Sequence, residues 1–178
     1  RLQAPALVAG NLPYNVGTAI LERLLARARR VPRAAFLLQK EVVDRLVARP
    51  GEPDYGALSV LVAARSRARR LGRLSPGAFR PPPRVESAFV GLELGVGAVA
   101  PQQFEAFARV VRLAFSRRRK TLRNALASGW GRDAAAAALA ALRLTPTARA
   151  ESLDLEAFLA LLDHAIAAGH EPAAGTGC

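Results

Sequence analysis

The stretch Ala6-Leu-Val-Ala-Gly-Asn-Leu-Pro-Tyr14 decides the fold class, because a short apolar run leads directly into a polar and aromatic turn. Ala6–Gly10 is typical of a strand buried on both faces of a parallel sheet. An amphipathic helix at Thr18–Arg29, a second buried strand at Ala34–Leu38 and a second helix at Lys40–Ala48 follow. Strand, helix, strand, helix is the alternation of a doubly wound α/β sheet.

The rest of the chain predicts a smaller helical part after the sheet. We expect a helix at Tyr55–Ala64, strands at Arg65–Leu74 and Val85–Leu94, and a linker at Gly95–Pro101. From Gln102 onward every segment favours a helix. The expected division is residues 1–97 as a partial Rossmann-like domain, residues 98–170 as an all-helical domain, and residues 171–178 as a flexible tail.

Positive charge is concentrated in the middle of the sequence. The formal net charge is +12, and residues 57–124 hold thirteen Arg and one Lys against three Glu. A field of this sign attracts polyanions. A compositional bias toward arginine explains the choice of arginine over lysine but not the scarcity of acids in this stretch. Nucleic acid is therefore the expected partner, with an anionic membrane surface as the alternative.

Other classes of protein are disfavoured by composition. The single cysteine, Cys178, excludes an internal disulfide, and it stands at no zinc-site spacing from His164 or His170. Apolar stretches such as Ala134–Leu142 are too short to span a membrane, and no secretory leader opens the sequence. We expect a cytoplasmic protein without a metal or a membrane span.

The turn Asn11-Leu-Pro-Tyr14 is the first candidate for function, because ligands bind at the carboxyl ends of strands in α/β sheets. The Asn11 side-chain oxygen and a neighbouring backbone carbonyl can accept both hydrogens of an amine. Pro13 stiffens the turn, and Tyr14 offers a flat face for stacking. The alternative is an ordinary strand-to-helix turn, for which the same residue types are suited.

A proline-rich arm, Phe79-Arg-Pro-Pro-Pro-Arg-Val-Glu-Ser87, is the second candidate. Its prolines predict a rigid extended segment that would hold Phe79 outward. An unstacked base needs a surface on each side, so Phe79 could complete a sandwich with Tyr14. The alternative is a linker between strands with Phe79 in the core.

The third candidate is the basic run that includes Arg117-Arg-Arg-Lys120 and Arg123. We expect a helix here, with Arg119, Lys120 and Arg123 on one side, and Leu122 and Leu126 inward. No acid lies between residues 106 and 132, which favours contact with phosphates over a merely solvated basic face.

Together and in this order, the motifs resemble the KsgA/Dim1 family of ribosomal RNA adenine dimethyltransferases, in particular its bacterial KsgA type. The resemblance extends to about Ala168. Its motifs are matched at Asn11–Asn15, Leu38–Val42, Tyr55–Val60, Phe79–Ser87, Arg118–Asn124 and Arg149–Glu151.

The resemblance implies the C-terminal half of a Rossmann-like methyltransferase sheet followed by a helical domain. It implies S-adenosylmethionine-dependent dimethylation of the N6 amines of two adjacent adenines near the 3′ end of small-subunit rRNA, by a monomer that acts on the pre-ribosomal small subunit. Asn11 and the Leu12 carbonyl would orient the amine in a turn fixed by Pro13, and Tyr14 and Phe79 would clamp the base. Phosphates would be held by Arg117, Arg118, Arg119, Lys120 and Arg123.

The sequence departs from the family at the donor site. The Gly-rich turn and acidic residues that bind S-adenosylmethionine are not found, and Asn11 is the one donor contact that remains. The sequence also has no methionine. We expect roughly a hundred residues, or two to three βα units, to precede Arg1, and this chain alone to be inactive. The alternatives are a large-subunit rRNA methyltransferase of the antibiotic-resistance type, which usually has Ile in place of Leu12, and a non-catalytic ribosome-assembly factor that binds RNA.

Overall fold

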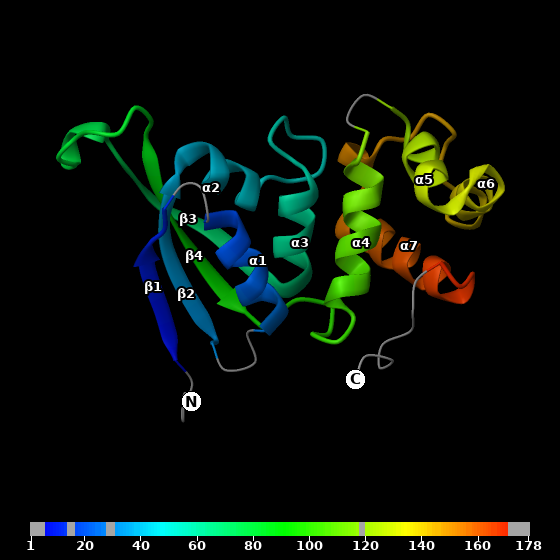
Figure 1. Cartoon of the computed structure of the whole chain (residues 1–178), viewed down its shortest axis with the longest axis horizontal. Coiled ribbons are helices and arrows are strands. Elements are labelled where there is room, and N and C mark those ends of the chain that lie inside the picture. Colours follow the sequence, from blue (N-terminus) through cyan, green and yellow to red (C-terminus); the bar gives the residue numbers. More distant parts are fainter. Residues whose placement is uncertain (1–5, 14–16, 28–30, 118–119, 171–178) are drawn as a thin grey trace.

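A four-stranded mixed sheet forms one side of the molecule (Figure 1). The computed structural model describes residues 6–13, 17–27, 31–117 and 120–170. β1 and β2 are parallel, whereas β4 is antiparallel to both of its neighbours, β2 and β3. The α/β class predicted from the sequence is confirmed. In spatial order the strands are β1 (Leu7–Asn11), β2 (Arg33–Gln39), β4 (Ser87–Leu94) and β3 (Ser66–Leu74).

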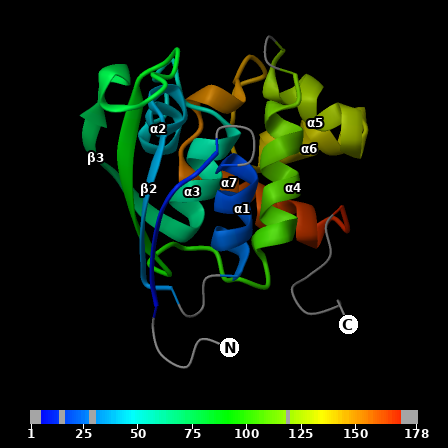
Figure 2. The same ribbon diagram turned by 60° about the vertical axis from the view of Figure 1, so that its left-hand side comes forward.

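Three helices cover one face of this sheet: α1 (Gly17–Arg27), α2 (Lys40–Val47) and α3 (Ala57–Arg65) (Figure 2). Alternate strand residues are buried beneath them, as the period of two requires. Among them are Ala34, Phe36 and Leu38 of β2, and Ala88, Val90, Leu92 and Leu94 of β4. The strand expected at Val85–Leu94 is therefore confirmed as β4.

The opposite face of the sheet is not covered by any helix within the described ranges. Leu7 is 75% exposed, Leu71 50% and Phe89 38%. β1 is also the edge strand, and every residue in it except Val8 is exposed. The expectation that this strand is buried on both faces is wrong for the described residues, because one face and one edge of β1 have nothing packed against them.

The helical part contains α4 (Phe104–Phe115), α5 (Leu122–Trp130), α6 (Arg132–Ala141) and α7 (Leu155–Ala167). Short 3-10 turns, η1 (Pro76–Ala78) and η2 (Ala150–Ser152), lie in the connections. The Asp154 carboxylate accepts a 2.9 Å hydrogen bond from the Ala157 amide and so caps the start of α7. The tail at residues 171–178 lies outside the described residues.

The segment expected to be a linker is packed tightly where the sheet part meets the helical part. Val99 is buried, and its carbonyl accepts a 2.6 Å hydrogen bond from the buried Arg65 guanidinium, which also donates to the Leu25 carbonyl. A Cβ on Gly97 would lie 2.2 Å from the Ala64 carbonyl oxygen, so only glycine fits this close approach. The boundary at residues 97 and 98 stays a prediction.

Candidate functional site

The turn at the carboxyl end of β1 presents unused polar groups. The Leu12 amide donates to the Leu37 carbonyl at 3.2 Å, and the Pro13 carbonyl accepts from the Gly17 amide at 3.0 Å. Asn11 and Pro13 are exposed and Leu12 is half-buried. Neither the Asn11 side chain nor the Leu12 carbonyl oxygen is hydrogen-bonded to another described residue. Both oxygens are therefore available as acceptors; Tyr14 lies outside the described residues.

The proline-rich arm leaves the same end of the sheet. Leu74, at the end of β3, pairs with Ser87, at the start of β4, and Ser87 pairs with Gln39, two residues beyond the partner of Asn11. Strands lie about 4.8 Å apart, so the ends of β1 and β4 are roughly 10 Å from one another. Figure 1 shows the arm projecting beyond the sheet at this end.

Within the arm, Phe79 is half-buried, and its amide donates a 3.2 Å hydrogen bond to the Pro76 carbonyl. Phe79 thus lies neither in the core nor wholly in solvent. The sheet topology places the arm and the Asn11 turn at the same end of the sheet, the end where β1 and β2 finish. The stacking of a base between Phe79 and Tyr14 stays a prediction.

The described cations of the basic run lie in the connection between α4 and α5 and in the first turn of α5, which corrects the single helix face expected from the sequence. Arg117 follows the end of α4, and Lys120 precedes α5, whose N-cap is Thr121. The Thr121 hydroxyl accepts from the Asn124 amide at 3.4 Å, and this cap marks the start of α5. Leu122 and Leu126 are buried as predicted. Arg118 and Arg119 lie outside the described residues.

The cations of this run that the structure describes have no acidic partner. Arg117, Lys120 and Arg123 are exposed, and none of them forms an ion pair within the described part of the chain. Some other cations do have acidic partners: Lys40 and Arg70 share the Asp44 carboxylate, and Arg112 pairs with Glu22. The basic run therefore keeps its charge available for an anionic partner.

These features face the same side of the molecule. In Figures 1 and 2 the carboxyl end of β1 lies in the upper half, and the end of α4 and the start of α5 lie at the top; in Figure 1 β1 is at the left and α5 at the right. A partner that contacts both the Asn11 turn and the basic run would therefore extend along this side.

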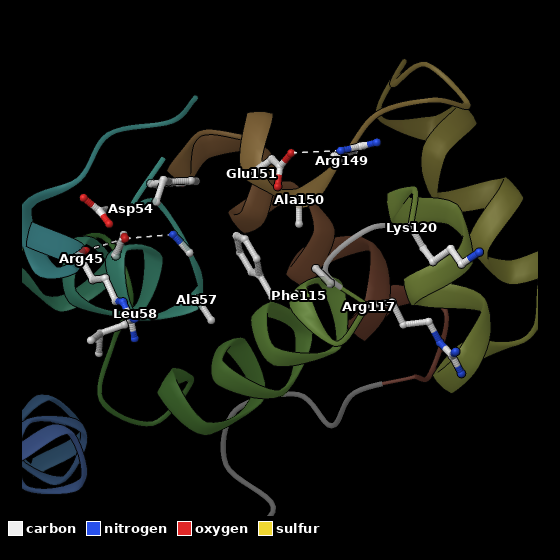
Figure 3. Close-up of a pocket in the computed structure, with 14 residues that line it drawn as sticks. Arg45, Asp54, Ala57, Leu58, Phe115, Arg117, Lys120, Arg149, Ala150 and Glu151 are labelled. Carbon is white, nitrogen blue, oxygen red and sulfur yellow. Dashed lines mark hydrogen bonds and ion pairs between the residues drawn. The ribbon is translucent and has the colours of Figure 1, made fainter. Parts of the chain in front are cut away.

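Sequence reasoning missed a pocket of about 270 Å³ between α3, α4 and η2 (Figure 3). Tyr55 borders it, and its hydroxyl donates a 2.7 Å hydrogen bond to the Leu153 carbonyl. Burial raises the pKa of Tyr55 to about 12, with a smaller contribution from the negative charge of Asp154. The sequence signal for this pocket is the motif at residues 55–60, which contains Tyr55, but no local pattern shows that Tyr55 meets Phe115 and Leu153.

A methyl donor would find little enclosure among the described residues near Asn11. Asn11 is exposed on the edge strand, so the described residues of the turn can contact only one side of a bound donor. A nucleoside-sized ligand normally has most of its surface buried in its site. The described residues by themselves therefore do not fit S-adenosylmethionine.

The described residues offer neither a cluster of metal ligands nor a membrane-spanning helix. No group of three or more His, Cys, Asp or Glu side chains among them could hold a metal ion. None of the helices in the described ranges combines the length and apolar character needed to cross a bilayer.

The fold is shared with rRNA methyltransferases. A dimethyladenosine transferase from Plasmodium falciparum superimposes with a TM-score of 0.74 at 21% identity, covering 92% of this chain and 67% of that one. The 23S rRNA methyltransferase ErmE superimposes with a TM-score of 0.62 at 22% identity, covering 92% and 66%. At these identities the likeness defines the fold alone.

The sequence defines the family. The model of the family described as ribosomal RNA adenine dimethylase matches residues 2–166. The Ribosomal RNA small subunit methyltransferase A of Bordetella petrii is 45% identical over 167 residues, which cover 93% of this chain and 62% of the relative. The chain thus spans about three fifths of the length of the curated relatives it matches. It belongs to the ribosomal RNA adenine dimethylase family, and the resemblance expected from its motifs is confirmed.

Proposed function

We propose that this chain forms the target-adenine and RNA-binding part of an enzyme that dimethylates the N6 amines of two adjacent adenines near the 3′ end of small-subunit rRNA. The observation that carries the proposal is the family match over residues 2–166, which includes the Asn11 turn at the carboxyl end of β1. We place the enzyme in the cytoplasm, as a monomer that acts on the pre-ribosomal small subunit during ribosome biogenesis.

The available acceptors of the turn suit the chemistry of an adenine amine. The lone pair of this nitrogen is delocalised into the ring and must be redirected before it can attack a methyl group. The Asn11 side-chain oxygen and the Leu12 carbonyl would accept its two hydrogens and draw the nitrogen toward a tetrahedral geometry, in a turn stiffened by Pro13. Because the amine is neutral, no prior deprotonation is needed, and positioning supplies much of the rate.

The arm and the basic run would hold the RNA around this amine. Tyr14 and Phe79 would stack on the two faces of the extruded base. Arg117, Arg118, Arg119, Lys120 and Arg123 would contact phosphates, as the free charge of the three described members supports.

The methyl donor of this reaction is S-adenosylmethionine. Because the described residues enclose so little space at Asn11, we infer that the donor is held chiefly by residues other than those of this chain, with Asn11 as one contact. This inference agrees with the greater length of the relatives.

Two alternatives make different predictions. A large-subunit rRNA methyltransferase has the same fold, as the likeness to ErmE shows, but the curated relatives at 42–45% identity are named for the small subunit. A non-catalytic assembly factor would bind RNA through the same basic run and would not need Asn11.

A hybrid enzyme tests the proposal. This chain would be joined to the part of the Bordetella petrii relative that it does not match, and dimethyladenosine in small-subunit rRNA would be measured by mass spectrometry. Asn11→Ala should lower kcat on the order of a hundredfold, as for a lost oriented hydrogen bond, with RNA affinity nearly unchanged.

Gly10→Ala is the matched control on the same strand, because its new Cβ would be 3.9 Å from the nearest side chain, an ordinary contact. The orienting role is wrong if Asn11→Ala is as active as Gly10→Ala, or if it loses activity only by unfolding. A hybrid that binds the RNA and never methylates it would favour the assembly factor.

A further inference from the structure

The pocket between α3, α4 and η2 has the features of a second RNA contact. Figure 3 shows Phe115 in its middle, between Ala57 of α3 and Ala150 of η2. Arg45 lies on the α3 side, and Arg117 and Lys120 lie on the opposite side, with their side chains extending away from Phe115. The lining therefore comes from both the sheet part and the helical part of the molecule.

An aromatic cluster forms the floor of this pocket. Phe115 is half-buried and stacks on Phe158, with ring centroids 5.8 Å apart and an angle of 20° between the planes. Tyr55 meets Phe115 edge to face at 6.3 Å, and its hydroxyl is already used by the Leu153 carbonyl. The cluster is thus held in place before any ligand binds, which favours stacking of a flat ring.

The charges around the pocket have both signs. Four cations line it, Arg45, Arg117, Lys120 and Arg149, together with the carboxylates of Asp54 and Glu151. The one ion pair among these described residues joins Arg149 to Glu151, at 3.5 Å and with both side chains about half exposed. A purely anionic ligand would use the cations but would leave the two carboxylates without a donor. A nucleotide satisfies both signs, because base amines donate to carboxylates and the phosphate contacts cations.

We propose that this pocket takes one unpaired nucleotide of the bound RNA, with its base against Phe115 and its phosphate toward Arg117 and Lys120. A paired base is covered on both faces by its neighbours and cannot enter a pocket of this size. The inference rests on the RNA-binding part of the proposed function and adds a recognition site that is separate from the Asn11 turn. The pocket performs no chemistry, and it selects an RNA by the position of an extrahelical nucleotide.

The test compares two RNA hairpins that differ by one extrahelical adenosine. The wild-type chain should bind the bulged hairpin at least about fivefold more tightly, the lower bound for stacking of one base on an aromatic ring. Ala57→Phe fills the pocket without changing any charge and should abolish this preference. Ala63→Phe is the matched control, because Ala63 is exposed on the same helix and does not line the pocket.

A second comparison, between two bulged bases, does not depend on whether Ala57→Phe folds. Cytidine and uridine differ at an amine and a carbonyl, so a bulged cytidine should bind more tightly than a bulged uridine. Glu151→Ala should remove that difference, because the Glu151 carboxylate oxygen that Arg149 does not contact can accept from the amine. Equal binding of both bases by the wild type would overturn this part of the proposal.

Asn11→Ala separates the two sites. The preference for the bulged hairpin should survive Asn11→Ala, whether or not the hybrid enzyme proves active. A preference lost in Asn11→Ala and kept in Ala57→Phe would assign the nucleotide to the β1 turn and overturn the pocket. Absence of any preference in the wild-type chain would overturn it as well.

Discussion

Neutralising the three described cations of the basic run together, by Arg117→Gln, Lys120→Gln and Arg123→Gln, should flatten the salt dependence of RNA binding. Each of these side chains is exposed, and none is paired with a carboxylate within the described ranges. A cation without a local partner gives its full electrostatic contribution to a phosphate and releases the counterion that the phosphate held.

The size of the effect follows from the number of contacts. Each phosphate contact contributes about 0.9 to the slope of log affinity against log salt concentration for a duplex. Three lost contacts should lower the slope by about 2.7. Between 50 and 200 mM salt each contact accounts for roughly 3.5-fold in affinity, so the wild-type chain should lose roughly fortyfold more affinity than the triple variant.

Fluorescence anisotropy with a labelled small-subunit RNA hairpin, titrated at several salt concentrations, measures this slope. Arg112→Gln is the control, because the Arg112 guanidinium already contacts Glu22 at 2.6 Å. That variant should leave the slope nearly unchanged. An unaltered slope in the triple variant, or an equal fall in the Arg112 control, would refute the assignment of this run to phosphates.

Three further predictions concern the stability of the fold and the binding of the methyl donor. Tyr55→Phe removes the hydrogen bond to Leu153 and should lower the free energy of unfolding in urea by about 1 kcal/mol. Because the folded-state pKa of Tyr55 is raised to about 12 from 10.0, its contribution is complete below pH 10 and lost as the pH rises through 12, so the gap between wild type and variant should narrow there. Gly97→Ala should cost about 1–3 kcal/mol by the same measurement, since its Cβ would overlap the Ala64 carbonyl, whereas Gly77→Ala has open space and should be neutral. Isothermal calorimetry should show no binding of S-adenosylmethionine to this chain, and a measurable dissociation constant would contradict the inferred position of the donor.

The elements of the fold could be predicted because their patterns are local. The period-two burial of β4 and the buried stripe of α4 follow from alternation and from i, i+3, i+4 spacing within single segments, and the strand and the helix expected there are both confirmed. The basic run shows where local spacing fails. A continuous helix period predicts one helix through Lys120, but a turn after α4 and the Thr121 cap interrupt it. Arg117 and Lys120 therefore lie in the connection, and Arg123 lies on α5.

The sequence by itself determined the class of sheet, the family and the three motifs, because each depends on residues adjacent in the chain. The tertiary structure decided which of them meet. The sheet register places the Phe79 arm at the end of the sheet where the Asn11 turn lies, although the strands that carry them are far apart in sequence. The nucleotide-sized pocket forms only where Phe115, Tyr55 and η2 converge, and Tyr55 reaches Leu153 over 98 residues of chain. The exposure of β1 has the same origin: its apolar run is a local property, but burial requires a neighbour on each face, and the described residues supply a neighbour on one.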